Sequence, residues 1–354
     1  MSNGKLSRIS DLMNAQVESG EISGAITAIA LKGEVVHFDA HGWKDIENKV
    51  EMPVDAIFRM ASSTKPVVGV ALMQQIEQGK VSPDDPVHKF IPTFRDTKVA
   101  VKKMGSTPSP DELAASPVTA DDAGSGPSQG TVSLGAGTGV RREPSDQPPE
   151  VDLVPAQREI LVRDLLTHTS GLLSGGLGSA VSQVQRQRGD TLASYIPQLG
   201  SVPLDFQPGS RWQYSPGTGI DVLGHIVELV SGQPLDVYLR EHIFEPVGMK
   251  DTFFALPEDR RQRLLPLYRK TEEGLVKADP STANRMASTT YFSGSGGLMS
   301  TASDYLQFER MLTNLGSLSG QQVLRPETVQ LMATNHVGDP VSYTHLTLPT
   351  KRIV

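Results

Sequence analysis

Hydrophobic and polar positions follow two different periods near the start of the chain. Residues 6–17 carry apolar side chains at helical spacing. Residues 25–31 and 34–40 read as two strands separated by the turn dipeptide Lys32-Gly33. We therefore expect a helix followed by two paired strands that begin an antiparallel sheet.

A strongly apolar run at residues 67–73 continues into Gln74-Gln-Ile-Glu77 and predicts a buried helix. Directly before it stands Arg59-Met-Ala-Ser62-Ser-Thr-Lys65. A serine hydroxyl needs a neighbouring base to become a nucleophile, and side chains three residues apart share one face of a helix. Ser62 and Lys65 are therefore a candidate nucleophile and its activator. The positive end of the helix would favour a developing oxyanion.

Other serines also fit nucleophile patterns. Ser2-Asn-Gly-Lys5 has the same spacing but lies at a terminus, where chains fray. Gly126-Pro-Ser128-Gln-Gly130 matches G-x-S-x-G, but it lacks the strand before and the helix after that this elbow requires. Spacing alone leaves open a bland alternative for Ser62, a serine cap followed by a solvated lysine.

Three longer segments decide between these readings. They are Phe58-Arg-Met-Ala-Ser-Ser-Thr-Lys-Pro66, Val162-Arg-Asp-Leu-Leu-Thr-His-Thr-Ser-Gly-Leu172, and the run from Pro208-Gly-Ser-Arg-Trp-Gln-Tyr-Ser215 to Glu245-Pro-Val-Gly-Met-Lys-Asp-Thr-Phe253. Together they resemble the serine β-lactamase-like superfamily, and within it the branch of class C β-lactamases, D-Ala-D-Ala carboxypeptidases and family VIII carboxylesterases. The resemblance extends from about residue 5 to about residue 338, apart from one insert. It implies an α+β fold, in which an antiparallel sheet flanked by helices carries an inserted all-helical domain.

The resemblance also implies a third site residue. The family's Y-x-N or Y-S-x motif corresponds here to Tyr214-Ser-Pro216, so Tyr214 would complete the site with Ser62 and Lys65. A tyrosine beside a lysine can relay a proton. Pro216 replaces the asparagine that lactamases place near their substrate, which favours esters over β-lactams.

Sequence patterns and the resemblance divide the chain into parts. Residues 1–83 would form the first part of the sheet domain with the nucleophile helix, and 84–285 a mostly helical domain with helices at 162–166, 179–196, 220–230 and 235–244. Residues 286–340 would return to the sheet domain through a glycine-rich stretch and a late helix. Residues of about 105–150 are poor in large apolar side chains and are predicted to be a disordered insert.

The segment at 341–354 resembles a translated sequencing adapter, and we expect it to be an artefact tail. In the family a third motif and further strands lie beyond this point. We therefore expect a truncated chain with its late strands missing and little or no activity. His336-Val-Gly338 matches one form of the third motif, H-x-G, but follows a helical pattern rather than a strand.

Composition narrows the possible partners. The net charge is −7 with no basic cluster, which argues against nucleic acid, and no run is long enough to span a membrane. The absence of cysteine rules out disulfides, and no H-E-x-x-H spacing is present, so we expect neither a metal nor a cofactor. We expect His168 to order a loop beside the cleft. A cytoplasmic location follows by default, and the oligomeric state stays open.

The sequence therefore predicts a serine hydrolase that cleaves small carboxylic esters through an acyl-enzyme. Two alternatives remain. One is a β-lactamase or D,D-peptidase, and the other is a catalytically inactive penicillin-binding-like module.

Overall fold

The computed structural model describes residues 3–103, 149–279 and 290–338, with side chains from residue 6 onward. Ser2, Ser128, most of the expected insert and the tail at 341–354 lie outside these residues. The predictions made for them stay predictions.

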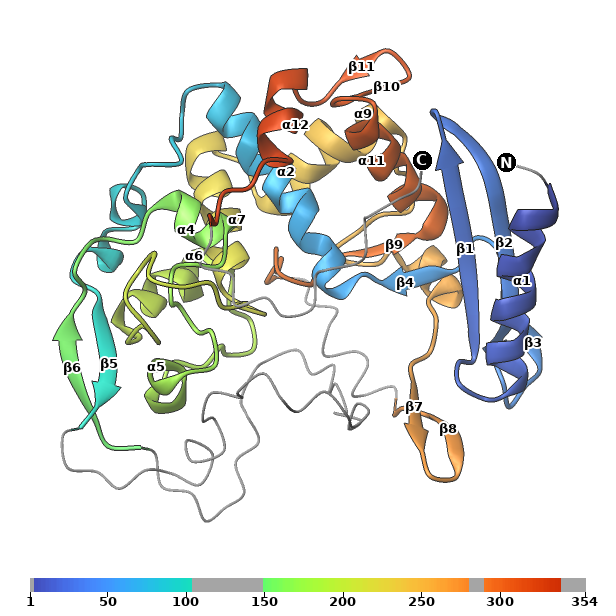
Figure 1. The fold of residues 1–354 in the computed structure, drawn as a ribbon, viewed down its shortest axis with the longest axis horizontal. Helices are drawn as coiled ribbons and strands as arrows, with labels where there is room; N and C mark the ends of the chain where they lie inside the picture. Colours follow the sequence, from blue (N-terminus) through green and yellow to red (C-terminus); the bar gives the residue numbers. More distant parts are fainter. Residues whose placement is uncertain (1–2, 104–148, 280–289, 339–354) are drawn as a thin grey trace, which may run out of the picture.

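The structure confirms the α+β class, with short antiparallel sheets among many helices (Figure 1). The α-helices are α1 (Asn3–Glu18), α2 (Thr64–Glu77), α4 (Val162–Leu166), α5 (Leu177–Val181), α6 (Leu192–Tyr195), α7 (Gly219–Ser231), α8 (Leu235–Leu239), α9 (Glu245–Val247), α11 (Ala302–Thr313) and α12 (Pro326–Met332). The strands are β1 (Gly24–Leu31), β2 (Glu34–Asp45), β3 (Val50–Glu51), β4 (Ile57–Arg59), β5 (Lys98–Lys102), β6 (Val151–Pro155), β7 (Tyr268–Thr271), β8 (Gly274–Lys277), β9 (Met299–Thr301), β10 (Ser317–Leu318) and β11 (Gln321–Gln322).

The N-terminal part has the predicted helix and strand pair. β1 and β2 are antiparallel, with Ile26 opposite Ala40 and a register shift at Ile29/Ala30, and β3 pairs with the far end of β2. The helix α1 packs on β2 and the helix α11 on β1, so the sheet lies between two helices that are distant in sequence (Figure 1).

The centre of the molecule is built on α2. This helix packs along α7, and five of its apolar residues, Val67, Val68, Val70, Ala71 and Leu72, are fully buried. At its N-terminal end, β4 pairs with β9 and so joins residues 57–59 to residues 299–301. Burying one valine or leucine side chain stabilises the folded protein by roughly 1.5–3 kcal/mol. The contact between α2 and α7 therefore holds the residues at the start of α2 in a fixed position.

The helix predicted at 179–196 is wrong. The chain leaves α5 at Val181, and a new short helix, α6, begins only at Leu192. Thr191 caps that helix, because its hydroxyl accepts a hydrogen bond from the Ser194 N–H at 3.1 Å. The polar run between the two helices has no apolar face to bury, so the favourable composition alone does not make it helical.

The central region also contains strands that the sequence analysis did not predict. β5 and β6 pair antiparallel, with Lys102 opposite Val151. β7 and β8 form a hairpin that reaches the N-terminal sheet domain, where the Tyr268 hydroxyl donates to Glu47 Oε2 at 2.6 Å.

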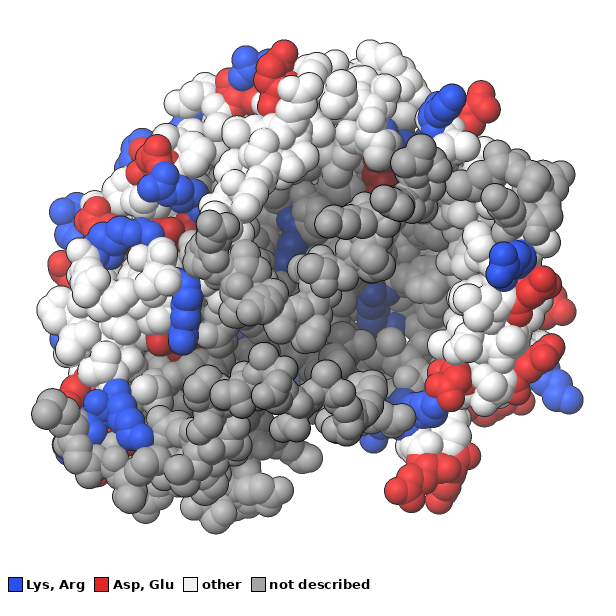
Figure 2. Space-filling model, in the orientation of Figure 1, with Lys and Arg blue, Asp and Glu red and all other residues white. Residues whose placement is uncertain are grey.

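Acidic and basic side chains are intermixed on the described part of the face shown in Figure 2. No described helix is both long and apolar enough to cross a membrane.

Candidate active site

Ser62 lies in a 3-10 turn, Ala61–Ser63, that runs directly into α2. The turn is held from behind, because the Met60 N–H donates to Leu298 O at 2.9 Å next to the β4–β9 pair. Ala61 has a φ of 44°, in the left-handed region that costs an alanine about 1 kcal/mol. Such strained residues tend to occur at functional sites, and this one presents the exposed Ser62 side chain to solvent.

Lys65 is buried one turn after Ser62, and its ammonium group has three oxygen neighbours. Nζ lies 3.1 Å from Ser62 Oγ, 2.8 Å from the carbonyl oxygen of Pro216 and 2.7 Å from that of Ser295. Two of these are backbone carbonyls on separate segments. They fix the direction of the amine so that its remaining position faces Ser62.

Tyr214 also contacts Ser62. Its hydroxyl lies 2.8 Å from Ser62 Oγ, and Lys65 Nζ stands 5.2 Å from the centre of its ring, within cation–π range. The ring is 39% exposed, so the pair of hydroxyls opens to solvent on one side.

The residues beside Tyr214 fasten its segment to the loop at 168–174. The Gln213 N–H donates to His168 O at 3.0 Å, and the Ser215 hydroxyl donates to Leu172 O at 2.9 Å. These two hydrogen bonds fix the backbone on either side of Tyr214, whose side chain then reaches Ser62. The segment Thr-His-Thr-Ser-Gly-Leu172 of the sequence analysis is therefore the support of Tyr214.

His168 itself supports the same segment. Its Nδ1 accepts a hydrogen bond from the Ser215 N–H at 3.3 Å, and its ring packs on Tyr214 with 4.8 Å between the ring centres. Burial, together with the positive charge of Lys65, lowers the pKa of His168 to about 4. The neutral ring is the form that can accept from Ser215. These contacts agree with the expected loop-ordering role.

The Ser295 carbonyl is positioned by a buried carboxylate on α7. Asp221 accepts hydrogen bonds from the Tyr291 hydroxyl at 2.7 Å, the Ser293 hydroxyl at 3.0 Å and the Ser295 N–H at 2.8 Å. Burial raises the pKa of Asp221, and these donors act in the opposite direction. Gly297 lets the loop turn here, since a Cβ would lie 2.8 Å from Ser293 O.

The structure thus brings together Ser62, Lys65 and Tyr214, the three site residues that the sequence predicts. His336 lies elsewhere, in an exposed loop after α12, where Nε2 bonds locally to Thr334 Oγ1 and Leu331 O. Sequence reasoning missed Asp221 and the two carbonyls. For Asp221 the sequence does hold a signal, since an acidic residue stands within the apolar pattern of α7. For the two carbonyls it holds none, because every residue has a backbone carbonyl.

Comparison with known proteins bears on this geometry. The model of the family described as Beta-lactamase matches residues 9–344. The chain belongs to the β-lactamase family. This assignment confirms the resemblance that the motifs carry, and the serine, lysine and tyrosine described above lie within the matched residues.

Relatives within the β-lactamase family include an esterase. Protein Rv1367c of Mycobacterium tuberculosis is 33% identical, over 91% of this chain and 70% of its own length. Esterase EstB of Burkholderia gladioli is 29% identical, over 72% of this chain and 53% of its own length. Among solved structures, EstCE1, described as a hydrolase with promiscuous acyltransferase activity, superimposes with a TM-score of 0.65 at 24% identity, covering 92% of this chain and 75% of EstCE1. The last similarity supports the shared fold.

Proposed function

We propose that this member of the β-lactamase family is a carboxylesterase that forms an acyl-enzyme on Ser62. The observation that carries the proposal is the convergence of Lys65 and Tyr214 on one serine oxygen, at 3.1 and 2.8 Å. A cap serine followed by a solvated lysine does not account for it, because Lys65 is buried and points at Ser62.

Lys65 is the proposed base for acylation. To act as a base, Lys65 must first lose the proton of its ammonium form. The neutral amine then has two N–H donors and one lone pair. The Pro216 and Ser295 carbonyls can accept both N–H groups, which aims the lone pair at the Ser62 hydroxyl. As Ser62 Oγ bonds to the ester carbonyl carbon, its proton passes to Lys65.

Tyr214 is the proposed acid for the leaving group. Collapse of the tetrahedral intermediate breaks the bond between the carbonyl carbon and the alcohol oxygen, which must then gain a proton. The Tyr214 hydroxyl, adjacent to Ser62 Oγ, is placed to donate it. Water then attacks the acyl-enzyme and releases the acid, with the same two side chains moving the protons.

The start of α2 supports the negative charge of the intermediate. Within the described residues the Ser62 N–H has no hydrogen-bond partner, as is usual in the first turn of a helix. It and the positive end of α2 lie beside the reacting oxygen. One such donor is typically worth about 10² to 10³ in rate.

Pro216 bears on the choice between esters and β-lactams. At this position the chain offers a backbone carbonyl to Lys65 and has no side-chain amide for a substrate. This supports an ester substrate, as does the similarity to EstB.

The test compares two neighbouring serines. Because the sequence predicts little or no activity for the chain as printed, both variants are made in a version extended with the C-terminal segment of a relative. There we expect Ser62→Ala to abolish both hydrolysis of p-nitrophenyl butyrate and labelling by a fluorophosphonate probe, while Ser63→Ala retains both. Equal melting temperatures establish that both variants fold. Substantial turnover by Ser62→Ala contradicts the proposal.

The same assays address the two alternatives. A β-lactamase or D,D-peptidase would turn over nitrocefin faster than short p-nitrophenyl esters. A catalytically inactive module would leave Ser62 of the unmutated protein unlabelled by the probe.

A further inference from the structure

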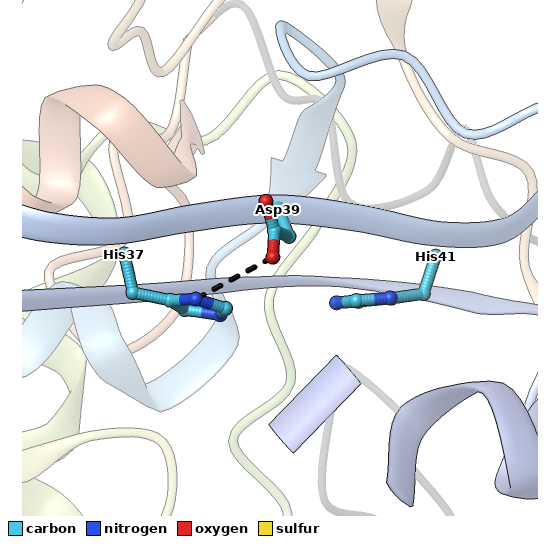
Figure 3. A group of neighbouring side chains, drawn as sticks. All are labelled: His37, Asp39 and His41. Carbon is cyan, nitrogen blue, oxygen red and sulfur yellow. Dashed lines mark ion pairs between the residues drawn. The ribbon is translucent and has the colours of Figure 1, made fainter. Parts of the chain in front are cut away.

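A second cluster of reactive side chains lies on β2, on the side that faces α1. His37, Asp39 and His41 alternate along the strand and therefore project from one face (Figure 3). One nitrogen or oxygen from each lies within 4.8 Å of those of the other two. Both imidazoles are about nine-tenths buried or more, whereas Asp39 is half exposed.

We propose that these three residues bind a divalent transition-metal ion, with Zn²⁺ as the best match. Two imidazoles and one carboxylate form a common ligand set for zinc, with a fourth position left for water. Tetrahedral zinc with bonds of about 2.0–2.1 Å places its ligand atoms roughly 3.3 Å from each other. His37 Nδ1 already lies 3.4 Å from Asp39 Oδ2, so a modest turn of His41 would complete the set.

The outer nitrogens of both rings have acceptors that suit metal ligation. If the metal takes His37 Nδ1, the opposite Nε2–H donates to Thr27 Oγ1 at 2.7 Å. If it takes His41 Nε2, the opposite Nδ1–H donates to Asn14 Oδ1 at 3.3 Å. Such partners hold ligating histidines in the correct tautomer and orientation.

With Asn14 Oδ1 facing His41 Nδ1, the network without a cation leaves one conflict. His41 donates to Asn14 through Nδ1, so its Nε2 must accept from the Thr27 hydroxyl, 3.0 Å away. Thr27 then accepts from His37 Nε2–H, and His37 Nδ1 is left with a lone pair facing the Asp39 carboxylate. A metal ion bound by His37 Nδ1 and Asp39 Oδ2 resolves this conflict.

The position of the cluster suggests what the metal would do. Asn14 and Ser10 belong to α1, and the Ser10 hydroxyl donates to Asp39 Oδ2 at 3.0 Å. Thr27 belongs to β1. A metal bound by β2 would therefore reinforce the contact among α1, β1 and β2, and Ser62 contributes nothing to the cluster.

Zinc binding is measured by competition between the tag-free, metal-stripped protein and a chromophoric chelator. We expect one Zn²⁺ per chain, and visible absorption bands typical of four-coordinate Co²⁺ when cobalt replaces zinc. Asp39→Asn keeps the shape of a half-exposed side chain and should lower the zinc affinity at least about 10-fold. His41→Gln should abolish binding.

The matched control is His336→Gln, which removes an exposed histidine elsewhere and should leave affinity unchanged. Zinc should also raise the melting temperature of the unmutated protein and of His336→Gln, but not that of His41→Gln. Failure of the unmutated protein to compete for zinc overturns the proposal. Equal affinities of Asp39→Asn and the unmutated protein overturn it as well, even if His41→Gln fails to fold.

Discussion

The helix pair α2–α7 and the sheet β1–β2 differ in how they are stabilised. On α2, Val67, Val68, Val70, Ala71 and Leu72 are all completely buried. On β1 no residue is fully buried, and on β2 His41 alone is. Hydrogen bonds and ion pairs contribute more to holding the sheet together. Thr27 bonds to both His37 and His41, and the Lys277 ammonium donates to Asp45 at 2.6 Å.

This difference explains where the reactive groups lie. Lys65 lies in the first turn of α2 and Ser62 in the 3-10 turn just before it, so both are held by a helix whose apolar residues are part of the core. His37, Asp39 and His41 lie in the sheet, where less apolar surface is buried. Each polar contact there makes up a larger share of the interactions that stabilise the region. The first region can hold a strained catalytic turn, and the second is where a bound ion would alter stability most.

The largest expected effect on the free energy of unfolding comes from replacing a leucine with alanine on α2, compared with the same replacement on β1. Leu72→Ala should destabilise the protein by about 2–5 kcal/mol, because it leaves a cavity between α2 and its neighbours. Leu31→Ala, at a side chain that is 40% exposed, should cost less than about 1 kcal/mol. Urea denaturation measures both, and similar losses would contradict the contrast between the regions.

The next effect concerns pH and His168. Its pKa is lowered to about 4 in the folded protein, below the ordinary value near 6.5, so the unfolded state binds more protons between these values. Stability should therefore fall as the pH drops from about 6.5 to 4, by up to about 3 kcal/mol from this residue alone. His168 has a φ of 57°, in the left-handed region that asparagine tolerates well. His168→Asn also retains a hydrogen-bond acceptor, and its loss of stability between pH 7 and 4.5 should be smaller. Identical losses for both proteins would refute this assignment.

A smaller effect is expected at Asp221, a positioning residue that acts through the Ser295 carbonyl. Asp221→Asn replaces one accepting oxygen by a donor and should displace the loop that directs Lys65. In the version extended with the C-terminal segment of a relative, we expect kcat for p-nitrophenyl butyrate to fall about 10-fold, or about 1.4 kcal/mol, with KM little changed. Tyr291→Phe removes one donor but retains the carboxylate, and should have a weaker effect. A rise in KM at constant kcat would point to a different role.

The smallest effect is expected from replacing residues 106–148 with a short Gly-Ser linker. Lys102 and Val151 are cross-strand partners, so a short turn can join β5 to β6. Loop-closure free energy grows slowly with length, and the melting temperature should change by no more than about 3 °C. Differential scanning calorimetry of the two proteins decides this, and a large decrease would show that the replaced residues contribute to packing.

Sequence reasoning succeeded where a local pattern carries the structure. The spacing of Ser62 and Lys65 and the tyrosine motif predicted residues that the fold brings together, and the apolar periods predicted α1, α2 and α7. It failed at 179–196, because a composition that favours helix does not supply an apolar face.

The rest of the site depends on contacts that no local pattern encodes. The Pro216 and Ser295 carbonyls meet Lys65 only after three segments pack together. His37, Asp39 and His41 do not have the helical spacing of metal motifs such as H-E-x-x-H. The alternation H-x-D-x-H within a predicted strand was the signal that could have found them.

The bonds around Lys65 join residues that are 151 and 230 positions apart in the chain. Neither half of the polypeptide contains enough of the site to arrange the amine, and α2 can form long before its carbonyl partners arrive. During refolding, helical circular dichroism should therefore recover earlier than reaction with the fluorophosphonate probe. Labelling of Ser62 by the probe would then show that the segments carrying Lys65, Pro216 and Ser295 have come together.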